Sequence, residues 1–377
     1  MTKLQNPHFP VKPKLIDKIT SMLHQVPIVT NKWRKDFVAR FVLALIQSRR
    51  VQFCEVAHHL NEGAKLASNQ TRIEDFFREV SVDYQQVALL LLTLLPTKAK
   101  LRLCVDRTEW DFGHYQANVL MVVAGCGQWQ IPLFWELLDN RSGNSNAAQR
   151  IDLLERCVAL VGKERVGLVI GDREFVGHRW VKWLKDTGLP FVMRLPAHHH
   201  ILRADGRRQT LTDFKGKARQ PVVLADCLVD GVWGQVWLKE LATGDWLFLF
   251  GTATGAHLGQ FYRKRWTIET VFQAFKSRGF NLETTHLRDS AKLKKLIGLV
   301  SLAYGFCRNL GLAYHQQIAP IPSKNHGYLA NSLCRKGINL LRQWLRPDQQ
   351  DPLIEWCLRL INLFTDRLIP HHLKIVG

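Results

Sequence analysis

Two aspartates have the residue type and the sequence context needed to hold a divalent cation. Asp106 ends the apolar segment LRLCVD, Asp172 ends the apolar segment GLVIGD, and an arginine follows each of them. We expect both segments to be strands whose ends are neighbours, so that the two carboxylates repel each other. A cation relieves that repulsion, and hard carboxylate oxygens favour Mg²⁺ or Mn²⁺. Because a lone aspartate at a strand end is commonly a turn residue, this interpretation depends on the pair.

A third acid lies in residues 259–279, a segment whose apolar spacing predicts one long helix. At about 100° per residue, Tyr262, Arg265, Glu269 and Lys276 fall within an arc of about 60° on one face of that helix. The alternative is a solvated Arg–Glu pair at i,i+4 spacing, which contributes only about 0.3 kcal/mol. An exposed pair leaves the aligned tyrosine and lysine unexplained, so we favour a site built from one helix face and two strand ends.

The elements that must position these acids follow a recognisable order. Strands are expected at residues 101–106, 117–126, 131–138, 167–172 and 191–195, with helices at 145–161 and 175–187. This order predicts an α/β fold, a mixed sheet with helices on its faces, in which acids at strand ends occupy the usual place for chemistry. Residues 196–245 predict an all-β insertion, after which residues 246–251 form a strand that returns to the core.

The flanks are predicted to be helical, at residues 1–95 and again at 290–317, 328–345 and 352–368. The expected domains are a DNA-binding domain at 1–97, a catalytic core at 98–195 and 246–320, a β-rich insertion at 196–245, and a C-terminal helical region at 321–377. The N-terminal helices could alternatively be a plain scaffold. The apolar face of the helix around 352–367 is either a dimer contact or is packed on its own core.

The charge of the chain indicates a polyanionic partner. The 377 residues carry a net charge of +20, distributed as +7 over residues 1–100, +2 over 101–260 and +11 over 261–377. Two basic ends around a nearly neutral middle favour nucleic acid, although a basic enzyme without such a partner is the alternative. The N-terminus lacks an apolar leader, the cysteines have no CxxC spacing, and Arg308 interrupts the apolar stretch 296–314. We therefore expect a cytoplasmic protein that is not embedded in a membrane.

The segment YRKRWTIETVFQAFK resembles the YREK signature, Y-x2-R-x3-E-x6-K, of the insertion sequence four family of bacterial DDE transposases. The contexts VDRTEW around Asp106 and GDREFVG around Asp172 resemble the first two acidic motifs of the same family. This similarity extends over about residues 100–290 of the chain.

The resemblance implies an RNase H-like catalytic core with the triad Asp106, Asp172 and Glu269, which holds two Mg²⁺ or Mn²⁺ ions per active site. It also implies cut-and-paste transposition: nicking at transposon ends, a hairpin intermediate, and strand transfer of the 3′-hydroxyl into target DNA. The partners would be double-stranded DNA at the inverted repeats and the target, with a homodimer formed on the DNA at the bacterial nucleoid. Tyr262, Arg265 and Lys276 would grip phosphates.

Further DNA contacts are expected at scattered positions. Trp246 matches a tryptophan that stacks a flipped base in relatives of that family, with a core aromatic as the alternative and Trp233 or Trp237 as substitutes. The charged contacts expected are Arg173, Lys292, Lys294 and Lys295, of which the three lysines could instead be a solvated face. Two other functions remain open: a metal-dependent nuclease that cuts without joining, and a DNA-binding descendant that has lost catalysis.

Overall fold

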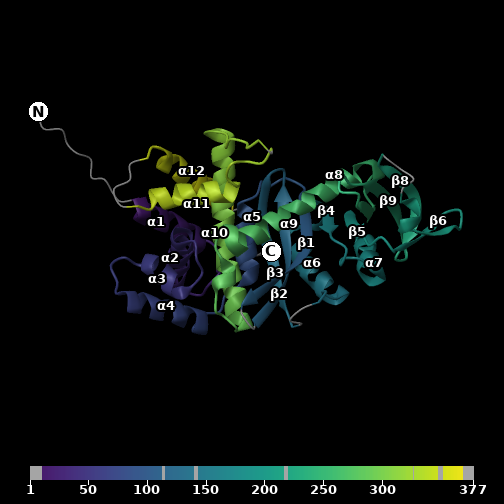
Figure 1. Cartoon of the computed structure of the whole chain (residues 1–377). Coiled ribbons are helices and arrows are strands. Elements are labelled where there is room, and N and C mark those ends of the chain that lie inside the picture. The colour runs from purple at the N-terminus through teal and green to yellow at the C-terminus, as the bar shows by residue number, and fades with distance from the viewer. Residues whose placement is uncertain are drawn as a thin grey trace, which may run out of the picture. The chain divides into compact units, whose positions relative to one another are not determined.

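The computed structural model describes residues 11–112, 115–139, 143–215, 220–325, 327–346 and 351–367. The chain divides into two compact units (Figure 1). The sheet unit comprises residues 98–127 and 132–272, and the helical unit comprises residues 1–97, 128–131 and 273–377. The outermost parts of the two predicted flanking domains, at residues 1–10 and 368–377, lie outside the described residues.

A mixed sheet of ten described strands has the order β3-β2-β1-β4-β5-β10-β9-β8-β6-β7. β1, β4 and β5 pair in parallel, and β2, β10 and the strands beyond β10 pair antiparallel. The strands are β1 (Leu101–Phe112), β2 (Tyr115–Cys126), β3 (Trp129–Leu138), β4 (Val166–Gly171), β5 (Phe191–Leu195), β6 (His200–Arg203), β7 (Arg208–Thr210), β8 (Val222–Val229), β9 (Val232–Glu240) and β10 (Trp246–Gly251). The predicted α/β mixed sheet is confirmed, and its first five strands have the 3-2-1-4-5 order of an RNase H-like core.

Helices α6 and α7 follow strands β3 and β4, respectively, along the sequence. α6 (Ala147–Val161) begins after a capping box formed by Asn146 and Gln149, which satisfies backbone N–H groups at the helix start. α7 (His178–Asp186) is shorter than predicted, because Gly177 precedes it with a φ of 114° that only glycine adopts without strain. Residues 172–177 therefore form a loop directly after β4 and not the first turn of a helix.

Asp106 does not end its strand, which corrects the prediction from the sequence. β2 pairs along β1 from Arg102↔Gly125 to Phe112↔Tyr115, so β1 continues six residues past the aspartate. The parallel pairing of β1 with β4 stops at Val105↔Gly171. Asp106 and Asp172 are thus the next residues beyond the end of that pairing. The two acids are neighbours as expected, but because the pairing of the strands ends there and not because both strands end there.

The insertion extends the main sheet. β9 pairs with β10 from Gln235↔Gly251 to Glu240↔Trp246, and β8, β6 and β7 add to the same edge. The predicted strands of this region are present, but they share a ladder with the core strands, which a local sequence pattern does not reveal. His199 anchors the β8–β9 turn, since its Nε2 lies 3.2 Å from Asp230 Oδ1.

The segment predicted as one helix over residues 259–279 is broken. α8 (Leu258–Tyr262), a 3₁₀ turn (η4, Arg263–Arg265) and α9 (Trp266–Gln273) follow one another, and a π-helical turn (η5, Ala274–Arg278) ends the run. Lys276 has a non-helical ψ of −124°. The prediction of one continuous helix is therefore wrong, and the helical-wheel position of Lys276, which assumes such a helix, does not apply.

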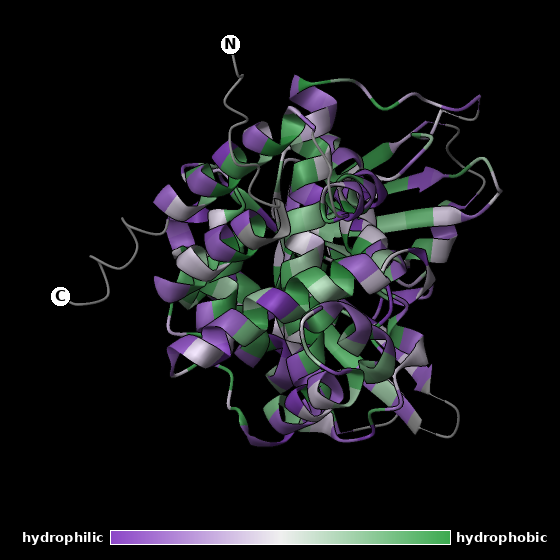
Figure 2. Ribbon diagram, turned by 90° about the vertical axis from the view of Figure 1, so that its left-hand side faces the viewer, coloured by the Kyte–Doolittle hydropathy of each residue, from purple (hydrophilic) through white to green (hydrophobic). Residues whose placement is uncertain are grey.

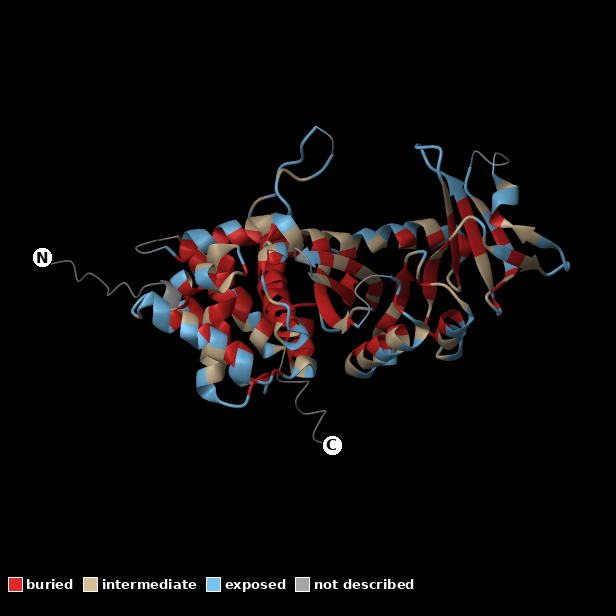
Figure 3. Ribbon diagram, turned by 60° about the horizontal axis from the view of Figure 1, so that its bottom comes forward, coloured by how far each residue is buried: buried red, intermediate tan, exposed pale blue. Residues whose placement is uncertain are grey.

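In the helical unit the buried helix α10 (Ser290–Gln317) packs against α2 and α11. The other helices are α1 (Val11–His24), α2 (Lys32–Ser48), α3 (Phe53–Leu60), α4 (Leu66–Glu79), α5 (Tyr84–Thr93), α11 (Leu333–Trp344) and α12 (Leu353–Asp366). Figure 3 shows α10 buried along most of its length, and Figure 2 shows helices with alternating hydrophobic and hydrophilic surfaces. By length and composition α10 could cross a membrane, but its apolar window is wholly buried, as predicted for a core helix.

The C-terminal helix α12 uses its apolar face inside its own unit. Leu360, Ile361 and Phe364 are buried, and Trp356 Nε1 donates to Gln317 Oε1 at 3.1 Å. Of the two alternatives drawn from the sequence, packing on its own core describes this helix.

Candidate active site

Three carboxylates converge on one guanidinium group in the sheet unit. Arg265 Nη1 lies 2.7 Å from Asp106 Oδ2, 3.1 Å from Glu269 Oε1 and 3.6 Å from Asp172 Oδ2. β1, the loop after β4, and the η4–α9 segment each contribute part of this cluster. The structure therefore brings the three predicted acids and Arg265 together, which we call the carboxylate cluster.

Two further side chains contact Asp172. Tyr262 Oη donates to Asp172 Oδ1 at 3.0 Å, and Arg194 Nη1 lies 3.6 Å from the same oxygen. Arg194 lies on β5 and was not predicted from the sequence; a basic residue one position before the end of a strand gives no motif of its own. Tyr262, by contrast, points into the cluster as its place in the signature suggested.

Burial and like charges govern the electrostatics of the cluster. Burial raises the pKa of Asp106 to about 7, the Arg265 charge opposes that shift, and the Asp172 and Glu269 charges add to it. Burial works against the charge of Arg265, yet the surrounding Tyr262 and the three carboxylates raise its pKa. Burial and the neighbouring Asp172 also raise the pKa of Tyr262. The cluster thus holds more negative charge than its burial favours, and it needs a cation.

The donor set fits a hard divalent cation, with one rearrangement. No group of three or more His, Cys, Asp or Glu side chains in the described ranges is arranged to hold a metal ion as it stands. The Arg265 guanidinium lies where the carboxylates converge, at hydrogen-bonding distance from Asp106 and Glu269. Carboxylate oxygens that already gather around one positive charge are the ligands that Mg²⁺ and Mn²⁺ prefer. A metal ion would take the place of the guanidinium.

A pocket of about 410 Å³ lies beside the two aspartates. Its lining consists of Asp106, Asn144, Asp172, Arg173 and Glu174. Arg173 is exposed, and its backbone N–H donates to Asp172 Oδ1 at 2.8 Å. The pocket opens beside the acids with an arginine at its edge, which suits an anionic substrate.

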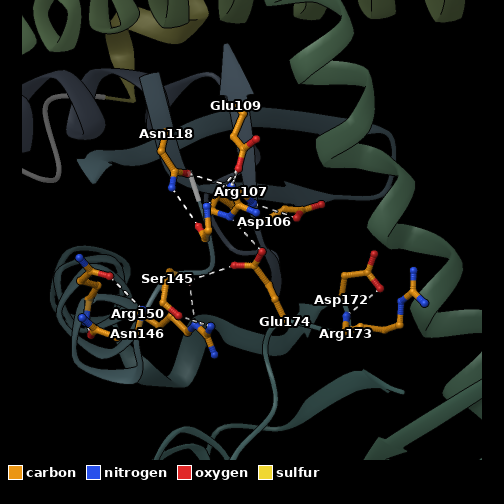
Figure 4. Close-up of polar contacts among 12 residues, drawn as sticks. Asp106, Arg107, Glu109, Asn118, Ser145, Asn146, Arg150, Asp172, Arg173 and Glu174 are labelled. Atoms are coloured by element: carbon orange, nitrogen blue, oxygen red, sulfur yellow. Dashed lines mark hydrogen bonds and ion pairs between the residues drawn. The ribbon is translucent and has the colours of Figure 1, made fainter. Parts of the chain in front are cut away.

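A second polar network lies next to the cluster and was not predicted. Arg107 Nε donates to Glu174 Oε2 at 3.0 Å, and Ser145 Oγ donates to Glu174 Oε1 at 3.0 Å (Figure 4). The sequence offered one signal, the arginine that follows each aspartate, but the two arginines differ. Arg107 is largely buried in this network, and Arg173 faces solvent.

Each of the remaining predicted contact residues has surroundings within its own unit. Trp246 is half-buried at the start of β10, where its ring stacks on Phe248 with centroids 6.1 Å apart. Trp237 is buried, while Trp233 is 47% exposed and stays accessible. Lys276 belongs to the helical unit, where its Nζ lies 3.6 Å from Glu283 Oε1.

The three lysines of α10 have different surroundings. Lys295 is buried, and its Nζ donates to the carbonyls of Phe76 and Phe77 at 3.2 and 2.9 Å, so its ammonium group is used inside the unit. Lys294 Nζ lies 5.2 Å from the centre of the Tyr84 ring. Lys292 is half-buried in the first turn of the helix. The DNA contact predicted for Lys295 does not fit its surroundings.

Comparison with known proteins gives one matching family and a likeness to solved structures. The sequence model of the transposase DDE domain matches residues 98–306, more than half of the chain. No curated protein sequence matches the chain. Among solved structures, the chain is similar to the cryo-EM structure of a piggyBac transposase synaptic complex with hairpin DNA, at 10% identity and a TM-score of 0.46. That likeness covers 96% of this chain and 87% of the other.

Proposed function

We propose that this chain, which belongs to the transposase DDE domain family, is a cut-and-paste transposase whose catalytic triad is Asp106, Asp172 and Glu269. As a DDE transposase it is a metal-dependent nuclease and strand transferase of DNA transposition. One observation carries the assignment of the triad: three carboxylates from separate elements converge on a single positive charge beside an open pocket.

The triad would hold two divalent ions, Mg²⁺ or Mn²⁺. When bound, such ions activate water or a 3′-hydroxyl and stabilise the leaving 3′-oxygen of a phosphodiester. The carboxylates of Asp106, Asp172 and Glu269 supply the ligands. In the absence of an ion, Arg265 offsets part of the negative charge of the cluster, as its short contacts with Asp106 and Glu269 indicate.

Arg265 and Tyr262 have a second role once the carboxylates hold ions. A guanidinium group released from Asp106 has planar paired donors that match a phosphate. Tyr262 orients Asp172 through its hydroxyl, and the neighbouring Arg194 adds positive charge on the same side. We infer that these three residues grip the scissile phosphate and keep Asp172 in place.

We further propose membership of the insertion sequence four subfamily and a hairpin route. The YREK spacing supports the subfamily, although the break at the π-helical turn means that Lys276 acts from outside the helix that carries Glu269. Trp246 is the candidate for stacking a flipped base, because it is half-exposed at the start of β10. Stacking would offset part of the cost of unstacking that base, about a few kcal/mol.

The basic ends of the chain are proposed to bind DNA outside the active site. Residues 1–97 would contact the inverted repeats, Lys292 and Lys294 would add phosphate contacts, and a homodimer would bridge two transposon ends at the bacterial nucleoid. Because the apolar face of α12 is buried in its own unit, we expect the dimer contact on another surface.

The test uses purified full-length chain and duplex DNA carrying the sequences that flank its own coding region, searched for short inverted repeats. With Mg²⁺ we expect nicked, hairpin and strand-transfer products on a denaturing gel. Asp106→Asn, Asp172→Asn and Glu269→Gln should each slow cleavage at least about a thousandfold, which corresponds to about 4 kcal/mol of barrier. Asp186→Asn, an exposed acid paired with Lys182 on α7, is the matched control and should cleave normally.

The other functions give distinct results in this assay. Cleavage without any joined product would identify a nuclease that cuts but does not transpose. DNA binding without cleavage in either Mg²⁺ or Mn²⁺ would identify a descendant without catalysis. Full cleavage by Asp106→Asn would overturn the triad.

A further inference from the structure

We propose that Glu174 is a positioning residue, which sets the distance between Asp106 and Asp172 by joining the strand that carries the first to the loop that carries the second. The inference rests on the proposed function, in which those two aspartates bind divalent ions. Glu174 lines the same pocket as the aspartates, but its own carboxylate serves another purpose.

Both oxygens of the Glu174 carboxylate are already used. Oε2 accepts from Arg107 Nε and Oε1 accepts from Ser145 Oγ, each at 3.0 Å. The Glu174 side chain is only 14% exposed and that of Arg107 only 15%. A buried carboxylate with a partner on each oxygen is a structural tie, in contrast to the acids gathered around Arg265.

The Arg107 side of the tie acts on Asp106. The two residues are adjacent on β1, so their side chains leave the strand on opposite faces and share a backbone. Arg107 also donates through Nη1 to Asn118 Oδ1 on β2 at 3.1 Å and is paired with Glu109. Arg107 is thereby fixed to two strands, and Glu174 is fixed to Arg107.

The Ser145 side of the tie acts on the loop after β4. Ser145 is buried, gives its hydroxyl proton to Glu174 and accepts from Arg150 Nε at 2.8 Å. The buried Arg150 also packs over the Phe175 ring, 5.0 Å from its centre. Two consecutive residues, Glu174 and Phe175, are thus held by Ser145, which precedes the N-cap of α6, and by Arg150 on α6. Asp172 lies only two residues away from Glu174.

The Glu174 contacts should affect ion binding, because the affinity for an ion depends on the positions of its ligands. Partners that orient metal ligands typically change metal affinity or activity by about 10- to 100-fold when they are removed. Glu174 contacts no carboxylate of the cluster, so its effect on an ion must pass through the backbone of β1 and of the 172–175 loop. Removing it should weaken ion binding without removing a ligand.

The experiment measures Mn²⁺ binding to the full-length chain by calorimetry, alongside the melting temperature and the Mg²⁺ dependence of cleavage. For Glu174→Gln we expect about tenfold weaker Mn²⁺ binding and an equal rise in the Mg²⁺ concentration for half-maximal cleavage. Saturating Mg²⁺ should restore most of the rate, because all ligands remain. Ser145→Ala removes one anchor and keeps the ion pair with Arg107, so it should shift both quantities in the same direction by less.

The outcomes separate this proposal from the proposed function. If Glu174→Gln binds Mn²⁺ as tightly as the wild type does, or if it melts early and Ser145→Ala leaves Mn²⁺ affinity unchanged, Glu174 has only a structural role. If the wild type binds no Mn²⁺, or Asp106→Asn keeps its affinity, the proposed metal site itself is wrong, whatever Glu174 does. Asp186→Asn should match the wild type in every measurement.

Discussion

Two charged clusters lie side by side in the sheet unit, and they differ in how well their charges are balanced. The carboxylate cluster gathers Asp106, Asp172 and Glu269 around Arg265. The neighbouring network sets Arg107 and Arg150 against two glutamates, with the hydroxyl of Ser145 between them (Figure 4). In the first, negative charge exceeds what burial favours; in the second, opposite charges balance and the hydrogen bonds are shared out.

The contrast indicates that the carboxylate cluster binds a cation and that the neighbouring network is a scaffold. A balanced buried network holds a shape, and losing one member leaves a partner uncompensated. A buried cluster with an excess of like charge lowers the stability of the folded protein until a cation binds to it. The excess is visible at Asp106, whose pKa is raised to about 7 by burial and by the two other acids.

The first test of the contrast is Arg107→Ala, for which we expect the largest loss of stability. The change leaves Glu109 and Glu174 without the cation with which both are paired. Breaking such a buried arrangement lowers the free energy of unfolding by about 3 kcal/mol. Urea unfolding of the metal-free protein measures it.

The control for that prediction is Arg156→Ala. Arg156 pairs with Glu136 and Asp152 but is 35% exposed, so its loss should cost less than about 1 kcal/mol. Equal losses for the two variants would mean that the network is no more of a scaffold than an ordinary surface ion pair.

The second test is Asp106→Asn in metal-free buffer, which should make the protein more stable at pH 8. The pKa of Asp106 is about 7 in the folded protein, above the ordinary aspartate pKa of 3.8 that applies on unfolding. Between these values the unfolded chain binds fewer protons, so wild-type stability falls as pH rises and the penalty remains above pH 7. Asparagine cannot ionise and escapes that penalty.

Unfolding at pH 5 and pH 8 with a chelator measures the difference. The advantage of Asp106→Asn should grow by at least about 1 kcal/mol between the two values, since one pKa unit corresponds to about 1.4 kcal/mol. Asp186→Asn corrects for general effects of pH. An advantage that is the same at both pH values would show that Asp106 carries no excess charge, and the contrast would fail.

Local patterns in the sequence were sufficient to predict that the three acids lie close together and to place most strands of the sheet. The strand at Phe191–Leu195 and the strand at Trp246–Gly251 lie where apolar runs predicted them, and α10 has its predicted ends. The spacing of the signature also predicted that Tyr262 and Arg265 lie on the same side as Glu269. These features depend on residues that are close in the sequence, where periodicity and motif spacing are informative.

What the sequence could not predict depends on contacts between distant segments. β1 continues past Asp106 because β2 pairs with it, and Lys295 is buried because the end of α4 offers it two carbonyl oxygens. The tie between Arg107 and Glu174 joins residues 67 positions apart. The π-helical turn at Lys276 is local, but no glycine or proline within the turn announces it.

The third and smallest expected effect concerns the second Asp-Arg pair. Arg173 follows Asp172 as Arg107 follows Asp106, yet it is exposed at the rim of the pocket. Arg173→Ala should change the free energy of unfolding by less than about 0.5 kcal/mol. If Arg173 contacts a phosphate, the slope of log affinity for duplex DNA against log salt should fall by about 0.9.

Fluorescence anisotropy with labelled duplex and a chelator, which prevents cleavage, measures that slope. Arg107→Ala, assayed under conditions where it is folded, should keep the wild-type slope, because its charge serves the network and not the substrate. The two variants should thus have opposite effects. Arg107→Ala loses stability and keeps its phosphate contacts, whereas Arg173→Ala loses a phosphate contact and keeps its stability. An unchanged slope for Arg173→Ala would remove Arg173 from the DNA-binding surface and leave Arg265 and Arg194 as the arginines beside the scissile phosphate.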